Sequence, residues 1–154
     1  MILVTLGTQK EPFTRLLEYI EKSNIEEKII VQAGHTKFTS EKMQVFDFIT
    51  YEKMTDYLKN ADLIITHGGT GSIIMPLKMG KKIIACARLK KYKEHVDDHQ
   101  EQIIEVFKEE GYILELNEEN NLNEIYEQIN NFKPKHFISN TENFIKNLKK
   151  EIDK

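Results

Sequence analysis

A glycine-rich segment, Thr66–Ser72 (Thr-His-Gly-Gly-Thr-Gly-Ser), carries the residue types in this chain that best suit ligand binding. Three of the seven glycines of the chain fall within four of its positions. Glycine lets the backbone approach a ligand closely, and the first turn of a following helix offers unpaired N–H groups and a partial positive charge. Such a site suits a phosphate. The alternative is a tight strand-to-helix turn without a ligand, in which Thr70 and Ser72 only cap the helix.

Two common nucleotide-binding fingerprints are absent from this segment. Alignment of Gly69 and Gly71 with the dinucleotide pattern G-x-G-x-x-G requires glycine at position 74, where the chain has Ile74. The P-loop pattern G-x-x-x-x-G-K-[ST] does not occur either.

A second cluster of polar residues, His95–Gln100, contains His95, Asp98 and His99 as candidates for acid–base chemistry. On a helix, His95 and His99 would share one face at a spacing that zinc ligands use. The zinc-protease pattern needs Glu after the first His, however, and Val96 stands there without an evident third ligand. A capped helix start and a set of groups that grip sugar hydroxyls are the other two interpretations.

The stretch from 78 to 93 carries seven basic residues and no acidic one. Such a run is usually a solvated face, but between the two polar segments it could attract an anionic nucleotide or an anionic membrane surface. Its members are Lys78, Lys81, Lys82, Arg88, Lys90, Lys91 and Lys93.

Alternating strands and helices position these residues. Apolar runs predict strands at Ile2–Leu6, Lys28–Ala33, Val45–Ile49, Leu63–Thr66, Lys82–Ala87 and Tyr112–Leu116. Helical spacing predicts helices at Phe13–Lys22, Tyr51–Asn60, Ile73–Met79, His95–Glu110, Leu122–Asn131 and Thr141–Ile152. This alternation predicts an α/β fold with a parallel sheet covered on both faces, in which ligands bind at the carboxyl ends of the strands. Gly7-Thr8-Gln9 and the glycine-rich segment would both lie at that edge.

Length and composition predict one domain over residues 1–154, of which 117–154 form a polar loop and C-terminal helices. A net charge of −3 gives no signature of nucleic-acid binding, and the lone Cys86 excludes an internal disulfide. No signal peptide precedes the first strand, and apolar runs such as Ile83–Ala87 are too short to span a bilayer. We therefore expect a cytoplasmic protein.

Three linked motifs give the chain a resemblance to a known family. Val4–Gln9, Thr66–Ser72 and Glu94–Gln100 resemble, in order and spacing, the C-terminal, donor-binding domain of family 28 glycosyltransferases over residues 1–115. They are similar in particular to the small soluble subunits of two-component UDP-sugar transferases. These include exopolysaccharide and capsule subunits of the PssE and EpsF type and the eukaryotic subunit that acts on dolichol-linked sugar. The third motif favours the bacterial branch.

The resemblance implies a Rossmann-like parallel sheet that forms the C-terminal half of a GT-B glycosyltransferase, with the UDP-sugar as donor and no cofactor or metal. It places the donor phosphates against Gly7, Thr8, His67, Gly69, Thr70, Gly71 and Ser72, and it adds Gln9 and Gly68 to the residues that bind the UDP-sugar. It places the donor sugar against Asp98, His99 and Gln100, with Arg88 nearby, and the uracil near Phe48 and Ile49. His95, Asp98 and His99 become candidates for the general base, which the partner chain could also supply.

The chain departs from the family pattern at two places. Met75-Pro76 stands where the family commonly has Glu-Ala, whose carboxylate binds ribose hydroxyls. Because Pro76 removes an N–H and restricts Met75, we expect the helix to start late or to be kinked. Cys86-Ala87-Arg88 replaces the frequent Val-Pro-Arg and keeps only the arginine.

The resulting expectation is the UDP-sugar-binding, catalytic subunit of a bipartite inverting glycosyltransferase. It would transfer a hexose, hexuronic acid or N-acetylhexosamine to a lipid-linked acceptor in exopolysaccharide or capsule biosynthesis. A membrane-anchored, acceptor-binding partner subunit would supply the other domain and hold the chain at the inner face of the membrane. A non-catalytic nucleotide-binding or scaffold subunit is the alternative. A UDP-sugar epimerase fits poorly, because Tyr126 is followed four residues later by Asn130 rather than lysine.

Overall fold

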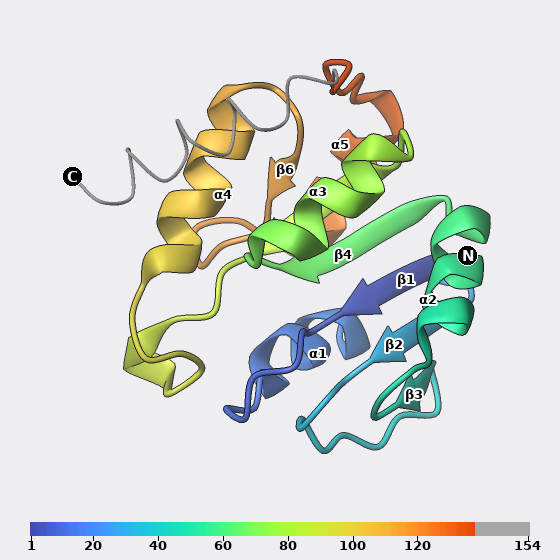
Figure 1. The fold of residues 1–154 in the computed structure, drawn as a ribbon, viewed down its shortest axis with the longest axis vertical. Helices are drawn as coiled ribbons and strands as arrows, with labels where there is room; N and C mark the ends of the chain where they lie inside the picture. Colours follow the sequence, from blue (N-terminus) through green and yellow to red (C-terminus); the bar gives the residue numbers. More distant parts are fainter. Residues whose placement is uncertain (138–154) are drawn as a thin grey trace.

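Six short strands pair in parallel into one sheet in the computed structural model, which describes residues 1–137 (Figure 1). The order across the sheet is β3-β2-β1-β4-β5-β6. The strands are β1 (Ile2–Thr5), β2 (Ile29–Gln32), β3 (Met43–Phe46), β4 (Leu63–His67), β5 (Lys82–Cys86) and β6 (Leu114–Glu115). The four central strands are buried almost throughout, as expected for a parallel sheet with both faces covered.

Each face of the sheet packs against its own layer of helices. Side chains alternate along the strands, so that Ile2 and Val4 belong to one core and Leu3 to the other. The first core packs against α1 (Thr14–Glu21) and α5 (Leu122–Asn131). The second packs against α2 (Tyr51–Asn60), α3 (Thr70–Lys78) and α4 (His99–Glu109). The predicted α/β fold with a Rossmann-like parallel sheet is therefore confirmed.

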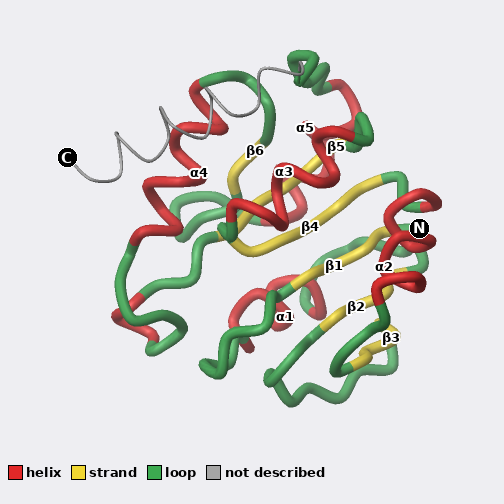
Figure 2. Tube along the Cα trace, viewed as in Figure 1, coloured by secondary structure: helices red, strands yellow, loops and turns green. Residues whose placement is uncertain are grey.

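The strand order reverses at the centre of the sheet. After β1, the chain adds β2 and β3 on one side, and it then returns to place β4 on the other side of β1. β1 pairs with β2 on one side and with β4 on the other, and Thr5 lies opposite both Gln32 and Thr66. In Figure 1 the arrowheads of β1, β2 and β4 point to the same edge. Figure 2 shows how short the loop between β4 and α3 is, so the start of α3 lies at that edge. An open parallel sheet binds ligands at such a switch point.

The predicted elements within residues 1–137 are all present, with some shifted boundaries. The third strand lies earlier than predicted, at Met43–Phe46, and a short 3₁₀ helix at Lys90–Tyr92 was not predicted. The helix predicted at Thr141–Ile152 lies outside the described residues. Among residues 1–137, no helix combines the length and the apolar character that crossing a bilayer requires.

The expected late start of the helix around Pro76 was wrong. α3 begins at Thr70 and continues through Pro76 to Lys78. The proline removes only the N–H that would bond to the carbonyl of Ser72, and its ring is buried beside Ile73 and Leu77. Packing of this apolar face against the sheet outweighs the local preference.

The expected start of the fourth helix at His95 was also wrong, because α4 begins at His99. The Asp97 carboxylate accepts a hydrogen bond from the His99 N–H at 3.0 Å, and Asp98 Oδ1 accepts one from the Lys90 N–H at 2.9 Å. Aspartate side chains that bond to nearby backbone N–H groups favour turns and helix starts over helix interiors. His95 and His99 therefore do not form an i, i+4 pair on one helix.

Candidate functional site

A pocket of about 390 Å³ lies at the switch point of the sheet. Its walls come from the ends of β1 and β2, from α2 and from the start of α3. None of its lining residues carries a charged side chain. They are Thr5, Gly7, Thr8, Gln32, Phe48, Ile49, Tyr51, Met54, Leu58, Ile64, Gly71, Ser72, Met75 and Pro76.

The amino end of α3 opens on this pocket. The residue before it, Gly69, provides no side-chain cap, and the first intrahelical bond runs from the Ile73 N–H to the Gly69 carbonyl at 3.2 Å. The backbone N–H groups of Thr70, Gly71 and Ser72 therefore precede the helical bonding pattern. A Cβ added at Gly71 would have no atom within 4 Å. The helix thus presents N–H groups and the positive end of its dipole to open space, which suits an anionic oxygen.

The other glycines of the segment make room for side chains of the protein itself. A Cβ on Gly68 would lie 2.7 Å from Gln100 Cβ, and one on Gly69 would lie 2.5 Å from His67 Cε1. Gly7, with φ of +82°, faces His67 from the loop after β1, and a Cβ on it would lie 2.7 Å from His67 Nε2. Gly68 and Gly69 do not line the pocket. The segment therefore has a packed half, His67–Gly69, which contacts other side chains of the protein. It also has an open half, Gly71 and Ser72, which lines the pocket.

His67 and Gln100 hold the packed half together, and each side chain is only 3% exposed. The imidazole bonds through Nδ1 to Gln100 Nε2 and through Nε2 to Ser72 Oγ, each at 3.1 Å. Burial lowers the pKa of His67 to about 3, and the positive charge of Arg88 contributes further, so the ring is neutral near pH 7. The structure therefore places both side chains beneath the loop and not in the pocket. Gln100 does not line the pocket, and its contact with a donor sugar stays a prediction.

Arg88 also lies beneath the loop, where it is 1% exposed. Its guanidinium donates to the carbonyls of Glu11 at 2.6 Å, Glu94 at 2.9 Å and Leu6 at 2.5 Å. The guanidinium carbon, Cζ, lies over the ring of Phe13 at 5.1 Å from its centroid, and burial lowers the pKa of Arg88 to about 10. Arg88 thus ties the loop after β1 to the segment after β5, and it is not an open cation for an anionic ligand.

The predicted acid–base residues lie in the turn before α4. Asp97, which the sequence prediction did not include, bridges the two histidines, with His95 Nδ1 at 3.1 Å and His99 Nδ1 at 3.3 Å from its oxygens. The hydrogen bond from the His99 N–H lowers the pKa of Asp97, and the two histidines act in the same direction. Asp98 is exposed and bonds to the Lys90 backbone. Of the three predicted acid–base residues, only His95 contributes to the lowered pKa of His67.

The basic stretch from 78 to 93 does not form one surface patch. Lys81 donates to the carbonyls of Lys59 and Ala61 at the end of α2, and Lys82 donates to those of Ile129 and Asn130 at the end of α5. Lys91 pairs with Glu118 at 2.7 Å. These three cations neutralise helix carboxyl ends or an acidic neighbour, so they are not open to an anion, and attraction of an anion by the remaining lysines stays a prediction.

Of the site residues predicted from sequence, six line the pocket: Gly7, Thr8, Phe48, Ile49, Gly71 and Ser72. Gln9 does not line it. Thr5 and Gln32 were missed, although each is the polar last residue of an otherwise apolar strand. Gln32 Nε2 donates to the Gly7 carbonyl at 3.1 Å and fixes the loop after β1. A polar residue that ends a buried strand is a signal that sequence inspection could have used.

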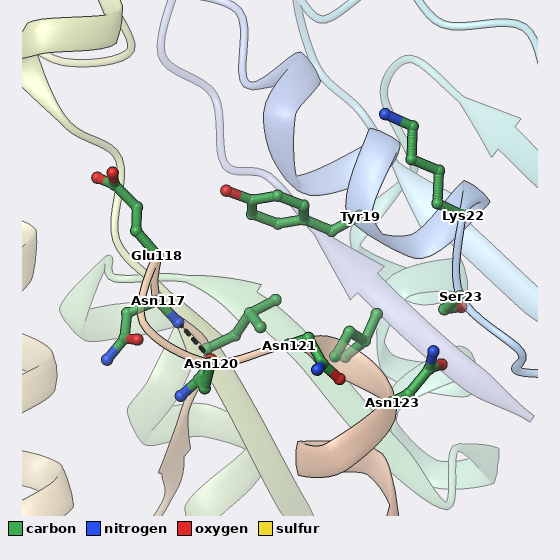
Figure 3. A pocket seen from close by; sticks show the side chains of 10 residues that line it. Tyr19, Lys22, Ser23, Asn117, Glu118, Asn120, Asn121 and Asn123 are labelled. Atoms are coloured by element: carbon green, nitrogen blue, oxygen red, sulfur yellow. Dashed lines mark hydrogen bonds between the residues drawn. The ribbon is translucent and has the colours of Figure 1, made fainter.

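Another pocket, of about 230 Å³, lies between the end of α1 and the loop from β6 to α5 (Figure 3). Its asparagines serve the loop itself, since Asn120 accepts from the Asn117 N–H and Asn121 from the Glu124 N–H, each at 3.0 Å. Asn123 accepts from the Asn24 N–H at 2.8 Å. This pocket shares no residue with the one at the glycine-rich segment. Among residues 1–137, no three His, Cys, Asp or Glu side chains converge in a way that could hold a metal ion.

The sequence matches the family described as the glycosyltransferase family 28 C-terminal domain over residues 1–154. The UDP-N-acetylglucosamine transferase subunit ALG13 of Saccharomyces cerevisiae is 37% identical over 73 residues, which are 47% of this chain and 34% of that protein. The ALG13 subunit of Candida albicans is 32% identical over 81 residues, which are 53% of this chain and 26% of that protein. The matched stretches thus span about a third or less of these relatives.

Solved structures show the same fold. The NMR structure of ALG13 superposes with a TM-score of 0.65 at 20% identity and covers 99% of this chain and 96% of that one. The glycosyltransferase SnogD from Streptomyces nogalater superposes with a TM-score of 0.57 at 16% identity, over 99% of this chain and 39% of its own. The fold of this chain therefore corresponds to one part of a larger glycosyltransferase.

Proposed function

This chain belongs to the glycosyltransferase family 28 C-terminal domain family, and from that premise we propose that it binds the diphosphate of a UDP-sugar as one subunit of a two-component glycosyltransferase. The observation that carries the proposal is the uncapped amino end of α3, which opens on an uncharged pocket beside Gly71. In this arrangement the phosphates lie against the N–H groups of Thr70, Gly71 and Ser72. The uracil and ribose lie along Phe48, Ile49 and Met75.

The helix end supplies the chemistry that departure of UDP requires. Negative charge grows on the β-phosphate as the bond to the sugar breaks, and fixed N–H groups in a pocket of low polarity stabilise it without reorganisation. Met75 occupies the pocket wall where the family commonly has glutamate, and it is 43% exposed. Its thioether cannot bind ribose hydroxyls as a carboxylate does, so donor affinity rests mainly on the diphosphate end.

His95 is the best placed general base on this chain. Its Nδ1 lies 3.1 Å from the Asp97 carboxylate, which holds the ring in place. The imidazole is partly exposed, in the segment next to the glycine-rich loop. Asp98 bonds to backbone and His99 is mostly exposed, so they are weaker candidates. A base on the partner chain remains compatible with the subunit proposal.

A second chain would complete the cleft. The likeness to one part of SnogD and to proteins named as transferase subunits supports a partner that binds the acceptor. We propose that this partner is membrane-anchored, that the acceptor is a lipid-linked sugar at the inner face of the membrane, and that the product is an exopolysaccharide or capsule. UDP-N-acetylglucosamine is the first donor to test, because the relatives are named for it. UDP-hexoses and UDP-hexuronic acids complete the screen.

Gly71→Val tests the proposed phosphate site. The added side chain projects into open space in the free protein but into the phosphate position of the complex. We expect UDP affinity, measured by calorimetry, to fall by about tenfold or more, since hydrogen bonds to a charged group contribute about 1.5–3 kcal/mol each. Lys78→Val, at the exposed other end of α3, is the matched control and should leave affinity unchanged.

Equal UDP affinity in Gly71→Val and the wild type would place the phosphates elsewhere. If the wild-type chain showed no thermal stabilisation by UDP or any UDP-sugar, the non-catalytic scaffold alternative would replace the transferase proposal.

A further inference from the structure

We propose that Gln100 is a positioning residue which, through His67, compels the Ser72 hydroxyl to donate its hydrogen into the pocket, toward an anionic oxygen of the bound nucleotide. The inference rests on the proposed function for the identity of that ligand. The arrangement of protons is independent of the proposed function, because contacts within the free protein already determine it. Gln100 lies 33 residues after His67 along the chain, at the start of α4, and touches no ligand itself.

Two backbone groups fix the orientation of the Gln100 amide. The N–H of Gly68 lies 2.9 Å and the N–H of Arg88 lies 3.1 Å from the same side-chain atom. Both are donors without any acceptor capacity, so the atom they share is the carbonyl oxygen, Oε1. The other atom of the amide is then Nε2, which can only donate. The reverse orientation would place an NH₂ group against two N–H groups in a buried site.

The amide in turn fixes the proton on His67. Because Gln100 Nε2 donates to Nδ1 at 3.1 Å, Nδ1 carries no hydrogen. A neutral imidazole has one N–H, which must therefore be on Nε2. Burial lowers the pKa of the ring, and the Arg88 guanidinium lowers it further, so the ring stays neutral.

Ser72 is the last member of the relay. His67 Nε2–H donates to Ser72 Oγ at 3.1 Å, so the hydroxyl oxygen acts as an acceptor on its protein side. Its own hydrogen is left to donate elsewhere, and Ser72 lines the pocket beside Gly71 at the amino end of α3. A hydroxyl held in this way adds a donor to the three backbone N–H groups. It also excludes the opposite state, in which Ser72 donates to His67 and withdraws its hydrogen from the ligand.

Gln100→Glu breaks the relay in a way that pH can reverse. A carboxylate can still accept from Gly68 and Arg88, but it cannot donate to His67. Neutral His67 then places its proton on Nδ1, toward Glu, and its bare Nε2 accepts from the serine hydroxyl. At lower pH the carboxylate favours imidazolium, whose Nε2–H again donates to Ser72. UDP affinity of this variant should therefore be retained in acid and be lost as pH rises through the pKa of its His67, which the new carboxylate raises above the wild-type value.

The measurement is UDP affinity at about pH 5.5 and about pH 8.5, with Gln102→Glu as the matched control on the exposed side of α4. Relative to that control, Gln100→Glu should bind UDP about tenfold more weakly at the higher pH and recover at the lower one. In a Ser72→Ala background the same substitution should produce no pH-dependent difference. A pH-independent loss of affinity, or a difference that persists in Ser72→Ala, would overturn the inference.

Nuclear magnetic resonance of the ¹⁵N-labelled imidazoles reads the relay without any nucleotide. We expect the wild-type His67 to carry its proton on Nε2 and Gln100→Glu to move it to Nδ1 at the higher pH. A wild-type ring protonated on Nδ1 would overturn the inference even if UDP binds well. The expected tautomer in a chain that does not bind UDP would support the relay and contradict the proposed function instead.

Discussion

The two halves of the glycine-rich segment look alike in sequence and do different work. Gly68 and Gly69 lack a side chain because Gln100 and His67 occupy the space that a Cβ would need. Gly71 lacks one although nothing in the protein lies within 4 Å of the position. A glycine that internal packing requires reports on the fold, whereas a glycine in open space reports on something the free protein does not contain. The comparison therefore directs the search for a ligand to Gly71 and Ser72.

The packed and open halves also differ in the ionisable side chains that surround them. The buried half holds the ionisable groups His67 and Arg88, and the protein itself satisfies their main hydrogen bonds. The open half offers only backbone N–H groups, hydroxyls and an amide. An anion in the pocket would thus meet dipoles, and its binding should depend less on salt than binding to lysines or arginines does.

Gly68→Ala, in the packed half, should have the largest effect on stability. Its methyl group would lie 2.7 Å from Gln100 Cβ, 2.9 Å from the Gln100 carbonyl oxygen and 3.0 Å from Ile104 Cδ1. Backbone must shift to relieve these contacts, and the bond from the Gly68 N–H to Gln100 would be strained. We expect a loss of about 3 kcal/mol or more in the free energy of unfolding by urea denaturation. A loss below about 1 kcal/mol would mean that the two segments are not tightly packed.

The second largest expected effect is a loss of folding stability in acid, through protonation of His67 in the packed half. The pKa of His67 is about 3 in the folded protein against an ordinary value of 6.5, so only the unfolded chain takes up this proton between those values. The stabilisation is complete above pH 6.5 and is lost as pH falls toward 3, by about 1.4 kcal/mol per pH unit. Between pH 6.5 and about pH 5 the loss should be about 2 kcal/mol.

The comparison of pH slopes isolates this contribution, because carboxylates titrate in both proteins. His67→Asn removes the titrating group, and its unfolding free energy should fall less steeply over the same range. Parallel slopes for the wild type and His67→Asn would show that His67 is not buried in its neutral form.

The sequence predicts the fold well because its signals are local. Continuous apolar runs such as Leu63–Ile65 define the buried strands, and helical spacing defines the helices. The start of α4 escapes this reasoning because Asp97 forms local hydrogen bonds that compete with a helix. The start of α3 was also predicted wrongly. Here packing of the apolar face of the helix outweighs the local effect of Pro76.

The site is harder to predict because its division depends on contacts between distant segments. Nothing near Gly68 indicates that Gln100 fills the space beside it, and nothing near Arg88 indicates that its two terminal nitrogens donate to three carbonyls. Sequence inspection therefore places Arg88 and Gln100 beside a ligand, while the structure places them under the loop that would hold it. Gly7, Gly71 and Ser72 line the pocket because they lie at strand and helix ends that follow from the fold itself, and their contact with phosphates stays a prediction.

Gly71→Ala has the smallest expected effect on stability and the most direct bearing on the comparison. Gly71 lies in α3 without a positive φ, so alanine should stabilise the free protein by about 0.5 kcal/mol through the entropy of the unfolded chain. Gly80→Ala is the matched control, because that position also has open space but a φ of +74°, where a side chain is strained and should destabilise. Thermal unfolding measures whether each variant is more or less stable than the wild type. UDP titration should show weaker binding only for Gly71→Ala. If Gly71→Ala is more stable and binds UDP as well as the wild type does, glycine at this position is required neither by the fold nor by the proposed ligand. The distinction between the two halves would then have no functional meaning.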